Sequence, residues 1–166
     1  MSHLQTQSRR AAETQGKMKC TLYPRALRFC DSQYHGCITK MNENEISLKI
    51  VTAAIEVHRT LGGPGLLESV YEEALAWELN QTGCAVERQV QSPIGYKEVT
   101  FATPLRIDLL VNSLVIVECK AVSNYNEIFE VQTLTYLRLR NLKRGLVINF
   151  GSKLVKDGIH RVVNGL

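Results

Sequence analysis

Two acidic residues and one lysine stand inside strongly apolar segments of this 166-residue chain. Asp108 lies in RIDLLV (residues 106–111), and Glu118 and Lys120 lie in VIVECKAV (residues 115–122). Burying a charge is costly unless the charge is paired or bound to a metal. Carboxylate oxygens suit hard cations, so Asp108 and Glu118 are candidate ligands for Mg²⁺ or Mn²⁺. A lysine beside them can orient a water or stabilise negative charge that develops on a phosphate.

The same residues have a simpler interpretation as an Asp/Glu–Lys ion pair that is buried or lies at a sheet edge. An acid followed further on by Glu-x-Lys is common by chance, so the pattern alone does not establish catalysis. Side chains alternate in direction along a strand, which puts Glu118 and Lys120 on one face and Cys119 on the other. The position of the charged residues within hydrophobic strands favours the metal site.

Asp108 and Glu118 can share a metal only if the hairpin between them turns both side chains to one face. A two-residue loop at residues 112–113 would place Asp108 opposite Val117, and a one-residue slip of this kind sends Glu118 to the other face. A three-residue loop over residues 112–114 places Asp108 opposite Glu118, and a bulge has the same effect. We therefore predict a three- or five-residue connection, or a bulge, with the carboxylates within about 6 Å of each other.

Helical and strand-like periodicity surrounds these residues and predicts the elements that hold them. Asn42 is a predicted helix N-cap, and apolar residues then recur at 3.6-residue spacing as far as Leu61. Further helices are predicted over about residues 66–81 and 126–141. Strands are predicted at residues 85–90, 97–101, 105–111, 114–122 and 144–150, whereas the tail 153–163 is ambiguous. This order predicts an α/β fold in which helices flank a mixed central sheet.

Two polar pairs on the predicted helices are further candidates. Glu68 lies in the first turn of the second helix, three residues before Tyr71, so the two share a face. Gln132 and Tyr136 lie one turn apart on the third helix. Alternatively, Glu68 is a first-turn acid favoured by the helix dipole, and the Gln132 pair is the polar edge of an amphipathic helix.

Basic residues gather at the end of the third helix, and they either contact phosphate or form a solvated helix end. This basic patch consists of Arg138, Arg140, Lys143 and Arg144. The net charge of +4 does not decide between these interpretations, because residues 1–40 carry seven Lys and Arg against two Asp and Glu. The remaining residues, 41–166, carry thirteen against fourteen, a net charge of −1.

The chain is predicted to contain one domain, residues 41–166, preceded by a segment without helical or strand periodicity. We expect residues 1–40 to be disordered or a non-native extension. Five cysteines form no CxxC pair, which argues against a zinc site and for reduced thiols in a cytoplasmic protein. No apolar run of about 18 residues is present, so no membrane span is predicted. Whether the chain forms a homodimer is left open.

Five segments together resemble the GxxExxY protein family, a branch of the PD-(D/E)XK nuclease-like superfamily. The resemblance covers nearly all of the chain beyond residue 40, and the segments occur in the family's order. They are GLLESVY (Gly65–Tyr71), RIDLLV, VIVECKAV, QTLTY (Gln132–Tyr136) and GLVINFG (Gly145–Gly151). One departure is Cys119, where the family usually has an aliphatic residue.

The resemblance implies a restriction-endonuclease-like core with an added leading helix. It also implies roles for six residues. Asp108 and Glu118 would be metal ligands for Mg²⁺ or Mn²⁺, Lys120 the catalytic lysine and Glu68 the acid on the first core helix. Gln132 and Tyr136 would line the edge of the active site.

Three functions remain in competition at this stage. The first is a metal-dependent nuclease acting on DNA or RNA, which the intact acid–acid–lysine set favours. The second is a non-catalytic module for binding nucleic acid or protein, which the slightly acidic domain favours, because affinity for phosphate is mostly electrostatic. The third is a structural protein with buried ion pairs, which would not bind metal.

The domain boundary can be tested by truncation. A chain beginning at Met41 should keep a nearly unchanged melting temperature, because the periodic, core-forming pattern begins there. Thermal unfolding of the full and shortened chains measures this. A large fall in melting temperature after truncation would mean that residues 1–40 contribute to the core.

Overall fold

The computed structural model describes residues 41–102 and 104–165, so the prediction for residues 1–40 lies outside the described residues. The first helix, α1 (Glu43–Thr60), begins where the sequence predicts. The Asn42 side chain accepts hydrogen bonds from the backbone N–H groups of Asn44 and Glu45, and the Glu45 carboxylate accepts one from the Asn42 N–H at 2.8 Å. This reciprocal cap satisfies donors that the first helical turn would otherwise leave free.

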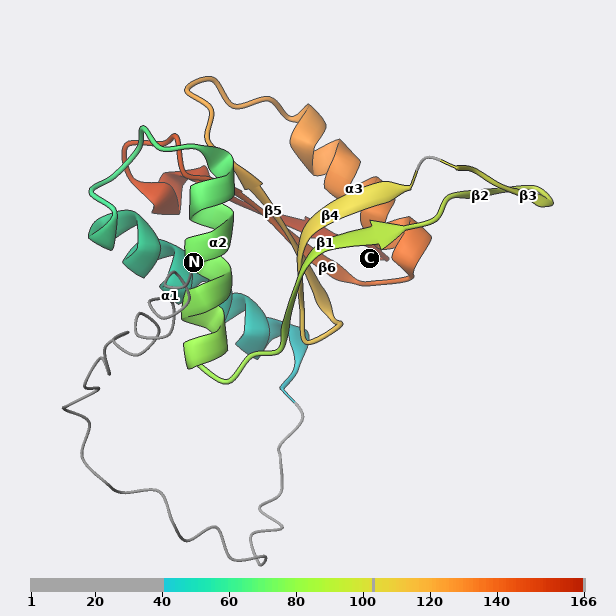
Figure 1. The fold of residues 1–166 in the computed structure, drawn as a ribbon, viewed down its shortest axis with the longest axis horizontal. Coiled ribbons are helices and arrows are strands. Elements are labelled where there is room, and N and C mark those ends of the chain that lie inside the picture. Colours follow the sequence, from blue (N-terminus) through green and yellow to red (C-terminus); the bar gives the residue numbers. More distant parts are fainter. Residues whose placement is uncertain (1–40, 103, 166) are drawn as a thin grey trace, which may run out of the picture. The chain divides into compact units, whose positions relative to one another are not determined.

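Two further helices and a five-stranded mixed sheet complete the core (Figure 1). The helices are α2 (Glu68–Gln81) and α3 (Ile128–Arg140). The sheet has the order β1-β4-β5-β6-β7, and its strands are β1 (Val86–Ser92), β4 (Leu105–Val111), β5 (Val115–Lys120), β6 (Arg144–Asn149) and β7 (Ile159–Val163). Only the β5–β6 pair is parallel, because α3 carries the chain back between these two strands. The predicted α/β fold with a mixed sheet and flanking helices is confirmed.

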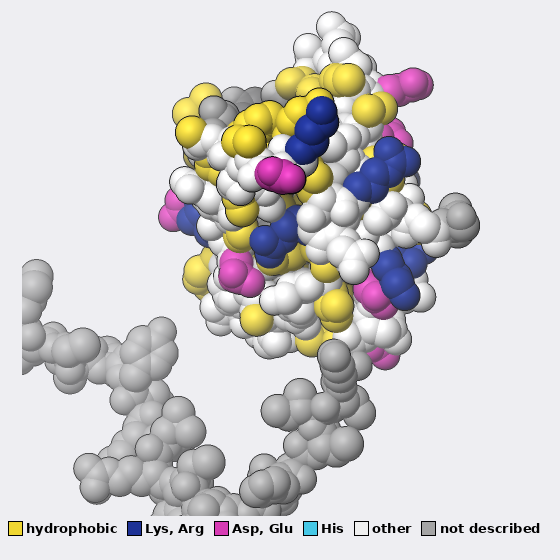
Figure 2. All heavy atoms as spheres, turned by 90° about the vertical axis from the view of Figure 1, so that its right-hand side faces the viewer, with side chains coloured by type: hydrophobic (Ala, Val, Ile, Leu, Met, Phe, Trp, Pro, Cys, Tyr) yellow, Lys and Arg dark blue, Asp and Glu magenta, His cyan; other side chains and the backbone are white. Residues whose placement is uncertain are grey.

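One segment differs from the sequence prediction, and one that the sequence left ambiguous has a defined structure. In place of one strand at residues 97–101, the chain forms a small hairpin of β2 (Gly95–Tyr96) and β3 (Val99–Thr100). Lys97 has a left-handed backbone (φ 55°) and makes the turn between them. This hairpin extends from the ends of β1 and β4 in Figure 1. Figure 2 faces that side and shows basic, acidic and hydrophobic side chains interspersed on it. The ambiguous tail forms the short 3-10 helix η1 (Val155–Gly158) and strand β7.

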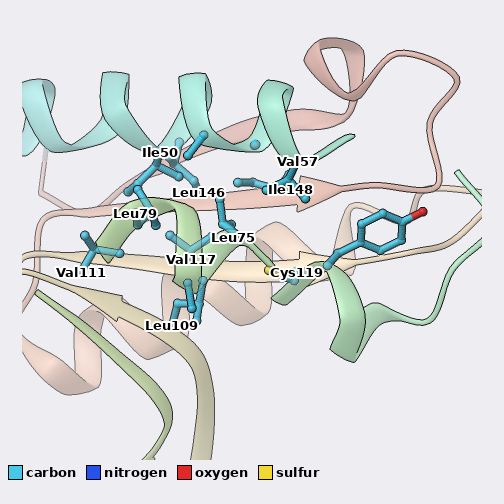
Figure 3. Packing of buried hydrophobic residues seen from close by; sticks show 14 of the residues in the cluster. Ile50, Val57, Leu75, Leu79, Leu109, Val111, Val117, Cys119, Leu146 and Ile148 are labelled. Atoms are coloured by element: carbon cyan, nitrogen blue, oxygen red, sulfur yellow. The ribbon is translucent and has the colours of Figure 1, made fainter. Parts of the chain in front are cut away.

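The sheet separates two buried clusters. On one face, α1 and α2 pack through Ile50, Leu75 and Leu79 onto Val117 of β5 and Leu146 of β6 (Figure 3). On the other face, Tyr136 and Leu137 of α3 pack onto a second set that includes Leu110, Ile116 and Val147. Within the described residues, no helix has the length and apolar character that crossing a bilayer requires.

The hairpin between β4 and β5 has the predicted register. Leu109 pairs with Val117 and Val111 with Val115, so residues 112–114 form a three-residue connection. Asn112 and Ser113 both have left-handed backbones (φ 50° and 56°), which asparagine and short polar residues tolerate better than most. Extending this register places Asp108 opposite Glu118. The predicted three-residue connection is therefore confirmed, while the prediction that the two carboxylates lie within about 6 Å of each other stays a prediction.

Strands β1 and β4 are distorted at Asp108. The register pairs Arg88 with Leu109 and Val90 with Ile107, but Gln89 and Asp108 between them do not pair. Gln89 has a left-handed backbone (φ 52°), which is costly for a residue with a side chain of this size. The side chains of β4 change faces at the same point. Ile107 packs into the cluster that α3 covers, whereas Leu109 packs into the cluster that α1 and α2 cover. In a regular strand, these two residues would share a face.

Asn149, the last residue of β6, ties down the chain just beyond Lys120. Its Oδ1 accepts hydrogen bonds from the N–H groups of Val122 and Gly151, both at 3.0 Å, and its Nδ2 donates to the Val122 carbonyl at 2.9 Å. Asn149 is 2% exposed, so these bonds are shielded from water. They fix the direction in which the chain leaves β5.

Gly151 is required because the backbone of Val122 lies against it. A Cβ at position 151 would lie 2.7 Å from the Val122 nitrogen and would overlap its carbonyl. We predict that Gly151→Ala lowers the free energy of unfolding by about 1–3 kcal/mol, as overpacking does elsewhere. Chemical denaturation measures this. Gly95→Ala is the matched control, because a Cβ there meets nothing within 4 Å, and its effect should stay within about 0.5 kcal/mol. Equal stability of both variants would show that the backbone around Val122 yields easily.

Candidate active site

Three carboxylates surround the amino group of Lys120 at the end of β5. The Lys120 Nζ lies 3.0 Å from Glu118 Oε1, 3.6 Å from Glu68 Oε1 and 3.9 Å from Asp108 Oδ2. The structure therefore brings together four of the six residues to which the sequence assigns catalytic roles. With three acids and one base, the cluster carries a net charge of −2 when all four groups are ionised.

Different elements position the four side chains. Glu118 and Lys120 are two residues apart on β5 and so share a face. Asp108 comes from the distorted point of β4, and its Oδ2 accepts a hydrogen bond from the Cys119 N–H at 3.0 Å. Glu68 is the first residue of α2, where the helix dipole favours an anion.

Tyr71 has a structural role near this site rather than a role in its chemistry. Its hydroxyl donates to the Gly63 carbonyl at 2.8 Å and accepts from the Leu66 N–H at 3.2 Å. Its ring is fully buried and stacks on Phe150 at a centroid distance of 4.6 Å. Tyr71 thereby anchors the turn that precedes Glu68 to the core.

Burial and mutual repulsion shift the ionisation of the cluster. Burial raises the pKa of Glu118 to about 7, and the neighbouring Asp108 adds to this increase, while Lys120 partly opposes it. Burial also raises the pKa of Glu68, again against the opposing effect of Lys120. For Lys120 itself, burial alone would lower the pKa, but Glu118, Asp108 and Glu68 outweigh it and raise the pKa above its usual value. Lys120 is therefore a cation at neutral pH, and cannot serve as a base.

One oxygen of Glu118 is available to a further ligand. Glu118 is 3% exposed, and its Oε2 has no hydrogen-bond partner although it is buried. A buried carboxylate oxygen without a partner is costly, and a bound cation would relieve that cost. Within residues 41–102 and 104–165, no group of three or more His, Cys, Asp and Glu side chains forms a ready-made metal cage. Mg²⁺ does not need one, because it is usually held by one or two carboxylates together with waters and substrate phosphate. Asp108 and Glu118 fit this mode.

An open cleft of about 720 Å³ lies beside the acids. Glu68 and Asp108 form part of its wall, and further residues from α2, β1 and β4 complete it. The ones that sequence analysis did not identify are Leu67, Ser69, Glu72, Arg88, Gln89, Gln91 and Arg106. Strand alternation does not identify Arg106, because β4 is distorted at Asp108. The distortion at Gln89 leaves no signal in the sequence.

The other two residues with predicted catalytic roles, Gln132 and Tyr136, lie on α3. The Gln132 side chain donates to the Tyr136 hydroxyl, and Tyr136 is 6% exposed within the α3 cluster. No hydrogen bond or ion pair joins either of them to the four charged residues among the described part of the chain. The link from α3 to the site is Phe129, whose ring centre lies 5.6 Å from Lys120 Nζ. The catalytic roles of Gln132 and Tyr136 remain predictions.

The predicted basic patch lies at the other end of the sheet. Arg144 pairs with Val115 at the start of β5, whereas Lys120 ends that strand, and five residues of strand span about 16 Å. The Arg144 guanidinium donates to the side chain of Asn44. The structure therefore does not bring Arg138, Arg140, Lys143 and Arg144 to the acids, and contact of this patch with phosphate remains a prediction.

The raised pKa of Glu118 predicts how stability depends on pH without metal. Glu118 holds its proton more tightly in the folded chain than in the unfolded chain, where its pKa is near 4.5. Folding stability should therefore fall as the pH rises from about 5 to about 7, by on the order of 2–3 kcal/mol, and Glu68 contributes in the same direction. Urea denaturation in EDTA measures this. Glu118→Gln should remove most of the fall, and an unchanged pH dependence in that variant would contradict the assignment.

One comparison with known protein families found a match. The profile of the PD-(D/E)XK nuclease superfamily matches residues 44–162, which include the five strands of the large sheet and the three helices except for the first residue of α1 and the last residue of β7. Searches of curated proteins and of solved structures found no match. The narrower resemblance to the GxxExxY family remains a prediction. The match covers most of the chain, and the chain belongs to the PD-(D/E)XK nuclease superfamily.

Proposed function

We propose that this protein is a metal-dependent phosphodiesterase that cleaves DNA or RNA, with Mg²⁺ or Mn²⁺ held by Asp108 and Glu118. The observation that carries the proposal is the excess of negative charge around Lys120. Three carboxylates lie within 4 Å of one amino group, and one buried Glu118 oxygen has no partner. A divalent cation would balance the charge of −2 and would be a partner for the unpaired Glu118 oxygen.

The chain's own residues divide the remaining work. A bound Mg²⁺ or Mn²⁺ would supply Lewis acidity toward a phosphate oxygen. Lys120, kept protonated by its three acidic neighbours, stabilises the negative charge that develops on the phosphate as the new bond forms. Glu68 is 44% exposed at its side chain and borders the cleft, so it can hold a water and accept its proton.

The α3 residues complete the proposal at the edge of the site. Gln132 and Tyr136 would keep the helix surface beside Phe129 in place and so support the position of Lys120. This arrangement fits the GxxExxY resemblance, in which the two residues line the active-site edge.

A second candidate is a non-catalytic binding module on the nuclease fold. The observation that favours it is the net charge of −1 over residues 41–166, which gives the domain no general attraction for a polyanion. In this alternative, the acids and lysine form a structural cluster. Cleavage assays separate the two candidates.

The proposal predicts that Asp108→Asn and Glu118→Gln each lower cleavage by a factor of about 100 or more, since each removes a cation ligand. Both variants should fold. In Asp108→Asn the new amide oxygen can still accept the Cys119 N–H, and either change removes one of two mutually repelling buried carboxylates. Cleavage of labelled single-stranded, duplex and branched DNA and RNA measures activity, and thermal unfolding measures folding. Asp157→Asn, at an exposed acid of η1, is the control and should be fully active. If the wild type cleaves and both variants retain its activity, the site assignment is wrong.

A further inference from the structure

Arg106 is the cleft residue that the proposed mechanism leaves unexplained. It lies two residues before Asp108 on β4, its side chain is exposed, and it lines the same cleft as Asp108 and Glu68. Among the described residues, no acidic group lies within ion-pair distance of Arg106, and no hydrogen bond from its guanidinium is found. A guanidinium presents several donors in a fixed planar fork, which suits phosphate oxygens.

The second arginine of the cleft, Arg88, is already engaged. Its Nε donates to Glu72 Oε1 at 3.0 Å, and its Nη1 lies 3.8 Å from Glu73 Oε2. Glu72 is 5% exposed and also accepts a hydrogen bond from Gln89. Arg88 therefore neutralises a buried acid, and moving it to a ligand would leave Glu72 without its cation.

The charge balance of the cleft creates a need for another cation. A polyanionic substrate entering it meets Glu68 and Asp108, and Lys120 shares its positive charge among these two acids and the buried Glu118. A divalent ion bound by the acids would offset their negative charge locally. The negative charges of the neighbouring phosphates in the nucleic-acid strand would still have no cation beside them. The basic patch at the far end of the sheet is too distant to serve them, and Figure 2 shows no large basic field on the face to which the β2–β3 hairpin points.

We propose that Arg106 binds a backbone phosphate of the nucleic-acid strand beside the one that is cleaved, and so positions the substrate along β4. Arg106 and Asp108 lie two residues apart on β4, and both side chains line the same cleft. Arg106 and Asp108 can therefore contact consecutive parts of one strand. A site on a sheet strand is also held more rigidly than one on a loop. Arg106 is a positioning residue here, and this role rests on the proposed function only in requiring a nucleic-acid substrate.

Binding in a cleavage-deficient background tests the role. We would measure the affinity of Asp108→Asn and of Asp108→Asn/Arg106→Gln for a short fluorescein-labelled single-stranded DNA and its RNA and duplex counterparts, by anisotropy, with Mg²⁺ present. Losing a charge-assisted hydrogen bond to phosphate should weaken binding about tenfold. It should also reduce the slope of log affinity against log salt by about 1, which a merely structural change would not do. Arg106→Lys should retain the slope while losing part of the affinity.

Arg161→Gln is the matched control, because Arg161 is exposed on β7 at the opposite edge of the sheet, and it should change neither quantity. Within the Asp108→Asn background, none of the arginine substitutions should change thermal unfolding. An unchanged salt slope in Arg106→Gln would overturn the inference even if the wild type cleaves DNA or RNA. A reduced slope in a protein that shows no cleavage would retain Arg106 as a phosphate contact and reject the nuclease proposal alone.

Discussion

The structure depends on one electrostatic constraint, the burial of more negative than positive charge at the end of β5. Lys120 is the single cation within 4 Å of the three acids among the described residues, and Glu118 at 3% exposure has little access to water. Placing charges in such an environment costs free energy that packing elsewhere must offset. The cost is visible in the raised pKa of Glu118, which burial causes and Asp108 increases. A fold that maintains this cluster is poised to bind a cation.

Several features of the fold serve to maintain the cluster. The three-residue hairpin connection sets the register of β4 and β5. At the distortion beside Gln89, Asp108 lines the cleft while Ile107 and Leu109 enter different clusters. Asn149 holds the chain just beyond Lys120, and Gly151 lets that segment approach. Local strain of the kind seen at Gln89 persists only where the surrounding structure enforces it.

Much of this could be predicted from the sequence, and the reasons for the rest are physical. The helix starting after Asn42, the apolar strands around Asp108 and Glu118, and the register between them follow from capping, periodicity and parity. The β2–β3 hairpin escapes prediction because its strands are only two residues long and its turn uses a left-handed lysine. The sequence identifies a basic patch at the end of α3 but not its distance from the acids, which depends on the parallel β5–β6 pairing. That pairing puts Arg144 at the opposite end of the sheet from Lys120. The cleft with Arg106 arises from tertiary packing of α2 on β1 and β4, which no local pattern encodes.

The central claim, that the buried acids form a cation site, is tested most directly by titrating the protein with Mn²⁺ and Mg²⁺ in a calorimeter and following thermal unfolding in parallel. The account predicts binding of a single ion by the wild type and a gain in stability of about 2.7 kcal/mol at a hundredfold excess over the dissociation constant. Asp108→Asn should lose both effects, and Asp157→Asn neither. Wild-type protein that binds no ion, together with unfolding of Asp108→Asn, would contradict the account and would make the cluster a structural ion pair.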